Sequence, residues 1–62
     1  GDRYGEGLTL ASLGLLYAQQ GQKEKAVALW REALTKLHPA SPEYRKVRGW
    51  LEDSEGGEGS RR

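Results

Sequence analysis

The chain contains no cysteine and only one histidine among its 62 residues. Disulfide bonds are therefore excluded, and so is any metal site built on thiolates. His38 would need carboxylates at helical spacing to complete a metal site, and none is placed there. We expect no metal and no cofactor.

Residues that could carry out catalysis are equally scarce. There is no thiol nucleophile, and none of the serines has a base near it in a recognisable motif. We therefore expect that the chain is not an enzyme. The serines are Ser12, Ser41, Ser54 and Ser60.

The sequence also lacks a large excess of one charge and a long apolar run. Ten basic residues face nine acidic ones, for a net charge of +1, which argues against a strong attraction to nucleic acid or anionic membranes. Polar residues interrupt the best apolar segment before it reaches the roughly 18 residues that a membrane span needs. The start shows no basic segment followed by an apolar one, so no signal peptide is visible. We expect a cytoplasmic protein.

The small size has a further consequence. A chain of this length buries only about 60% of the surface that its unfolded form exposes, and it has no disulfide or metal to add stability. Contact with another protein surface is the remaining means of stabilisation. Size alone thus indicates a protein partner.

Apolar residues at three- and four-residue steps predict an all-α chain: an antiparallel helix–turn–helix over about 6–20 and 23–37, then a third helix over about 42–53. Asp2 can cap the first helix if that helix begins at Arg3, and Gly21 suits a left-handed cap at its end. Ser41 and Pro42 are typical of a helix start. We expect one domain over 1–53 and a flexible, disordered tail over 54–62.

The first helix is apolar on nearly every side, which is typical of a helix buried on every side. The other two helices cannot enclose it. The sequence therefore predicts that a groove along this helix is covered by a second protein chain. The expected groove residues are Leu8, Ala11, Ser12, Leu15 and Ala18.

The order of residues from 10 to 39 resembles one tetratricopeptide repeat, a helix–turn–helix unit with the signature W-x2-L-G-x2-Y…A-x3-F…P. The resemblance implies a unit that binds other proteins and performs no chemistry. It also implies that small residues allow the two helices to cross closely while larger ones fill the gaps. The expected repeat-packing residues are Leu10, Leu13, Gly14, Tyr17, Ala26, Trp30 and Ala33.

The third helix resembles the start of another repeat that does not continue. Arg48 stands where the close-packing glycine belongs, and a bulky charge there would block a further helix. Pro39 also comes one residue late. We expect a capping helix that ends an array. Its packing residues are Tyr44, Val47, Trp50 and Leu51, where Tyr44 stands for the aromatic of the signature, Val47 for the leucine and Leu51 for the tyrosine.

Two further comparisons with the family refine the expected function. The opening GDRYGEG resembles the D-R-x-G-E start of a longer repeat subtype that occurs in bacterial signalling proteins and in animal regulators of G-protein polarity complexes. Some family members grip a peptide carboxylate with Lys and Asn, but Ala11 and Leu15 occupy those positions here. An apolar groove favours a partner helix or peptide instead.

We thus expect a protein–protein interaction module, the terminal repeat of a scaffold or signalling protein, that binds a partner helix, a peptide or a neighbouring repeat. The alternative is a structural unit whose homo-oligomer rebuilds a multi-repeat array. Nucleic-acid binding by Arg45, Lys46 and Arg48 near Trp50 is a third interpretation, opposed by the acidic residues around them. Trp50 itself could be an exposed interface anchor.

Overall fold

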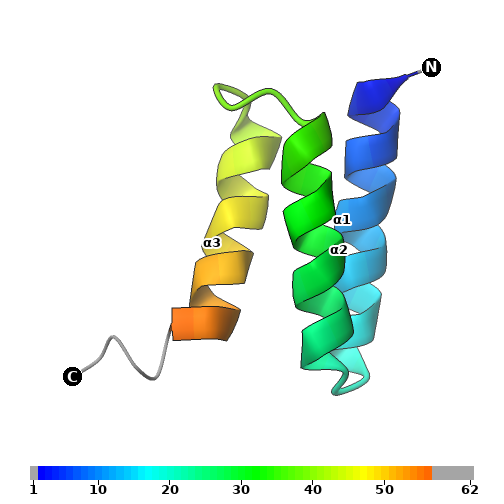
Figure 1. Ribbon diagram of the computed structural model, residues 1–62, viewed down its shortest axis with the longest axis vertical. Helices are drawn as coiled ribbons and strands as arrows, with labels where there is room; N and C mark the ends of the chain where they lie inside the picture. The colour runs from blue at the N-terminus through cyan, green and yellow to red at the C-terminus, as the bar shows by residue number, and fades with distance from the viewer. Residues whose placement is uncertain (1, 57–62) are drawn as a thin grey trace.

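A computed structural model describes residues 2–56, with side chains through Ser54, and it confirms the all-α fold. The elements are α1 (Arg3–Gln19), α2 (Lys23–Lys36) and α3 (Pro42–Gly56). Helix α2 runs antiparallel to α1, and α3 runs antiparallel to α2 (Figure 1). Helix α2 lies in the middle and packs against both neighbours, more extensively against α1 than against α3.

Local signals at both ends of α1 act as the sequence predicts. The Asp2 carboxylate accepts a hydrogen bond from the Gly5 backbone N–H at 3.1 Å, so it satisfies one of the free donors of the first turn. At the other end, Gly21 has a φ of +84°, a left-handed conformation that glycine adopts without steric penalty. Gln22 N–H then donates to the Tyr17 carbonyl at 2.9 Å, which closes the helix end.

The turn between α2 and α3 is held by hydrogen bonds among its own residues. Ser41 Oγ donates to the His38 carbonyl at 2.7 Å and accepts from the Tyr44 N–H at 3.2 Å, so it caps α3 as predicted. Ala40 N–H donates to His38 Nδ1 at 3.0 Å. Pro42 is the first residue of α3.

Helix α3 extends beyond its predicted end at residue 53. Residues 54–56 are helical rather than part of a flexible tail. That prediction relied on the lack of apolar residues, but a helix that has already formed adds a hydrogen bond with each further residue and can continue for a turn without burial. The remainder of the predicted tail, 57–62, lies outside the described residues.

The core is centred on Trp30 of α2, which is almost fully buried. Its indole Nε1 donates to the Ala11 carbonyl at 3.2 Å, directly across the α1–α2 contact. Small residues make this approach possible. A β-carbon at Gly14 would clash with the indole, and one at Gly7 would lie 2.7 Å from Leu37 Cδ2. The buried apolar residues are Ala11, Ala26, Trp30, Ala33, Leu37 and Val47.

Gly7 therefore has a packing role that the sequence analysis missed. It is one of three buried residues of α1, together with Ala11 and Gly14. The three are spaced by four and three residues, so they share the side of α1 that faces α2. A glycine near a helix start is otherwise expected only to weaken the helix.

Helix α3 packs on α2 through Val47 and Trp50. Val47 is 2% exposed, and the ring centroids of Trp50 and Trp30 lie 5.8 Å apart at a tilt of 43°. This geometry is within the favourable range for aromatic pairs. Trp50 is thus half-buried in an internal contact, so its interpretation as an exposed interface anchor was wrong.

Candidate interaction surface

The groove predicted along α1 does not form one free surface. Ala11 is buried against α2, and Leu15 is half-buried against the core. Leu8, Ser12 and Ala18 are exposed. The correction has a geometric reason: at 100° per residue, position 11 points toward α2 and position 15 lies at the edge of that contact.

The predicted repeat-packing residues divide into two groups. Gly14, Ala26, Trp30 and Ala33 are buried between α1 and α2 as expected, and Leu10 and Tyr17 are half-buried. The prediction that Leu13 packs between the two helices was wrong, since this residue is 40% exposed. It lies on the side of α1 opposite the α2 contact, and no described part of the chain covers it.

Leu13 belongs to an exposed strip that we call the outer face of α1. Three large apolar side chains lie on it: Leu8 is 36% exposed, Leu13 40% and Leu16 51%. They surround a shallow hollow of about 440 Å³. The residues that line the hollow, and that define the outer face, are Leu8, Thr9, Ser12, Leu13 and Leu16.

The outer face also lacks charge. No Asp, Glu, Lys, Arg or His occurs from Gly7 to Gln20, whereas α2 and α3 carry charged residues on their exposed sides. Surface helices normally place charged residues on the side away from the core. From Leu8 and Thr9 to Leu16, uncharged residues of this face recur at steps of three and four residues. This spacing could have identified the face from the sequence.

Two residues of the outer face of α1 can be compared with the residues through which α3 packs on α2. If the 34-residue repeat length that relates Leu10 to Tyr44 and Tyr17 to Leu51 is applied, Leu13 corresponds to Val47 and Leu16 to Trp50. Val47 and Trp50 are covered by α2, while Leu13 and Leu16 are not covered. With this repeat length, the two positions through which α3 packs on α2 have uncovered counterparts on α1.

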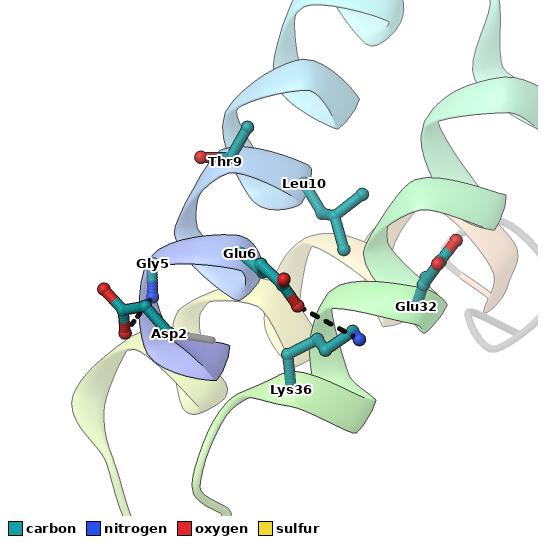
Figure 2. A pocket seen from close by; sticks show the side chains of 7 residues that line it. All are labelled: Asp2, Gly5, Glu6, Thr9, Leu10, Glu32 and Lys36. Atoms are coloured by element: carbon teal, nitrogen blue, oxygen red, sulfur yellow. Dashed lines mark hydrogen bonds and ion pairs between the residues drawn. The ribbon is translucent and has the colours of Figure 1, made fainter.

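A second hollow, of about 590 Å³, lies between the start of α1 and the second half of α2 (Figure 2). Two of its three carboxylates already have structural roles, because Asp2 caps α1 and Glu6 forms an ion pair with Lys36 at 3.2 Å. The described residues contain no group of three or more side chains able to hold a metal ion. The hollow is lined by Asp2, Gly5, Glu6, Thr9, Leu10, Glu32 and Lys36.

Two further contacts tie the start of α1 to the other helices. Arg3 Nη2 donates to the Thr35 carbonyl at 2.7 Å, beside the Glu6–Lys36 ion pair. Hydrogen bonding between the Tyr4 hydroxyl and the Glu43 carboxylate raises the pKa of Tyr4 and lowers the pKa of Glu43. These contacts fix the end of α1 but leave its outer face open.

The basic residues of α3 do not form a concentrated positive site. Arg45, Lys46 and Arg48 are exposed, and Arg48 forms an ion pair with Glu52 at 3.1 Å. A neighbouring carboxylate reduces the field that a phosphate backbone would meet. The geometry fits a solvated helix face better than a nucleic-acid surface.

Comparison with protein-family models, curated proteins and solved structures gave no match. The resemblance to a tetratricopeptide repeat therefore rests on the residues quoted above. No helix in the described part of the chain combines the length and apolar character needed to cross a membrane.

Proposed function

We propose that the chain is a cytoplasmic protein–protein interaction module, a tetratricopeptide-type repeat with a capping helix, that binds a helix of another protein through the outer face of α1. It acts by binding and performs no catalysis. The observation that carries this proposal is the exposure of Leu13 and Leu16 at positions whose counterparts, Val47 and Trp50, pack on α2.

The partner follows from the same correspondence. Since α3 uses this helix side to pack on α2, the outer face of α1 suits a helix with a surface like that of α2. That surface presents Trp30 to Trp50, and at the other end of the contact Val27 and Ser54 line the same hollow. An apolar stripe at three- and four-residue steps is the pattern by which helices dock in apolar grooves.

Burial of the outer face supplies the driving force. A fully buried leucine is stabilised by about 1.5–3 kcal/mol relative to an exposed one. Leu8, Leu13 and Leu16 are each exposed by a third to a half, so a docked helix recovers part of that free energy at each. No charged side chain has to be desolvated within the strip, which removes the main cost of such burial.

A peptide of residues 22–38, which spans α2, tests the proposal. Titrated onto the isotope-labelled chain, it should shift the amide resonances of Leu8, Leu13 and Leu16 and leave the residues around Val47 unchanged. The same peptide with Trp30→Glu is the matched control and should bind more weakly.

The double variant Leu13→Glu/Leu16→Glu should lose the peptide while keeping its helical content, because both side chains lie outside the core. Equal peptide affinity for this variant and the parent would overturn the proposal. So would shifts confined to the hollow at the start of α1, around Glu6 and Glu32.

A further inference from the structure

We infer that in the isolated chain the partner at the outer face of α1 is a second copy of the same chain, packed antiparallel with α1 against α1. This inference rests on the proposed function, since it names the occupant of that same face. The first argument is chemical: the strip is uncharged from Gly7 to Gln20, so two copies bring no like charges together.

The second argument is the order of large and small side chains along the strip. After Leu8 at its N-terminal end, the strip has the small residues Thr9 and Ser12 and then the large residues Leu13 and Leu16. In an antiparallel pair related by a two-fold axis between positions 12 and 13, Leu13 faces Ser12 of the second copy and Leu16 faces Thr9 of the second copy. Leu13 and Leu16 thus each meet a small side chain, the arrangement that allows close helix packing.

A parallel pair lacks this match, because Leu16 would meet Leu16 of the second copy, and Ser12 would meet another small residue. The hollow of about 440 Å³ also fits the antiparallel order, since Thr9 and Ser12 are among the residues that line it and a leucine of the second copy can enter it. A two-fold interface uses one patch twice, so the patch has to be complementary to itself.

The third argument is charge at the ends of the strip. Asp2, Arg3 and Glu6 give the start of α1 a net charge of −1, and Lys23, Glu24 and Lys25 give a net charge of +1 just past its end. Antiparallel packing brings the acidic end of each copy toward the basic end of the other. The helix dipoles of the two α1 helices are then also opposed.

The contact area available on α1 sets the expected affinity of the dimer. Specific interfaces bury about 800 Å² on each partner, a fifth of the 4259 Å² of accessible surface on this chain. One side of a 17-residue helix, about 25 Å long and 10 Å wide, offers less than that. We therefore expect a weak dimer that forms at high concentration and dissociates on dilution.

Sedimentation equilibrium over a concentration series up to about 1 mM tests the dimer. The parent chain should change from monomer to dimer across the series. Ser12→Leu should weaken the dimer at least tenfold, because it places two leucines against each other, although it makes the strip more apolar. Ala28→Leu, which adds a leucine at an exposed position of α2, should leave it unchanged.

Cysteine pairing tests the orientation, and the absence of native cysteine makes it clean. When a Thr9→Cys chain is mixed with a Leu16→Cys chain, the mixed disulfide should form faster than either homodimeric one. In the antiparallel pair, positions 9 and 9 of the two copies lie about 10 Å apart along the axis, as do positions 16 and 16.

Several results would overturn the inference. These are a parent chain that stays monomeric throughout the series, a tighter dimer for Ser12→Leu, and faster pairing of Leu16→Cys with itself. A monomeric chain that still binds the 22–38 peptide through Leu13 and Leu16 would remove the second copy as the occupant and leave the proposed function intact. A chain that forms the dimer but does not bind the peptide would overturn the proposed function and leave the second copy as the occupant.

Discussion

Gly14 and Trp30 are in direct contact across the α1–α2 interface, with no room for a side chain on the glycine. A β-carbon built on Gly14 would lie 2.5 Å from Trp30 Cδ1. One turn earlier in α1, the Ala11 carbonyl accepts the indole N–H at 3.2 Å. The largest side chain of the core therefore packs on the backbone of α1, which brings two short helices close enough to bury it.

Gly14→Ala should destabilise the fold, and Gly49→Ala should stabilise it. The first adds volume at the indole, and such overpacking costs about 1–3 kcal/mol. The second lies in an exposed part of α3 where a β-carbon meets nothing within 4 Å, so the better helix propensity of alanine adds up to about 1 kcal/mol. Urea unfolding of both variants measures the difference. A Gly14→Ala variant as stable as the parent or more stable would show that α1 and α2 do not meet closely at Gly14.

Trp30→Phe should lower the free energy of unfolding by about 1–3 kcal/mol, from the lost hydrogen bond and the volume that the smaller ring leaves. The near-ultraviolet circular dichroism should also weaken, because Trp50 no longer pairs with a second indole. Trp50→Phe is the control for the second effect. It should alter the same spectrum with a smaller loss of stability, since Trp50 donates no hydrogen bond to α1.

Gly21→Ala should lower the free energy of unfolding by about 1–2 kcal/mol, because an L-residue is strained at a φ of +84°. Gly21→Asn should cost less, since asparagine visits this region more readily. Thermal unfolding midpoints of the two variants make the test. A steric clash would not explain a loss of stability here, because a β-carbon at Gly21 has no neighbour within 4 Å. Unchanged midpoints would contradict the left-handed cap.

The Tyr4–Glu43 hydrogen bond predicts a dependence of stability on pH at both ends of the range. The pKa of Glu43 is lowered in the folded chain, so its contribution is present above the usual value of 4.5 and is lost as the pH falls through the folded pKa. The pKa of Tyr4 is raised, so its contribution is present below 10 and is lost as the pH rises through the folded pKa.

Tyr4→Phe removes the donor and should return the pKa of Glu43 toward its usual value, since that hydrogen bond is the largest cause of the shift. A titration of the Glu43 side-chain carbon by NMR follows this directly. The Glu52 carboxylate, which pairs with Arg48 instead, serves as the internal reference. An identical Glu43 titration in both chains would show that Tyr4 and Glu43 are not in contact in solution.

The helices themselves follow from local information. Asp2, Gly21, Ser41 and Pro42 act within three or four residues of their own positions, so their effects can be read without knowledge of the fold. The burial of Trp30 is equally predictable, because the apolar stripe of α2 has a clear polar side opposite it. Sequence alone thus determined the three helices, their order along the chain and the buried side of α2.

Only the tertiary structure decided which side of α1 is covered. Hydrophobic burial has no direction of its own, and a helix that is apolar all round offers α2 several possible sides. The choice depends on how closely two backbones can approach. Gly7, Ala11 and Gly14 allow contact with Trp30 and Leu37, and this places Leu13 and Leu16 on the outside. The candidate interaction surface is therefore what remains after the small residues have selected the packed side.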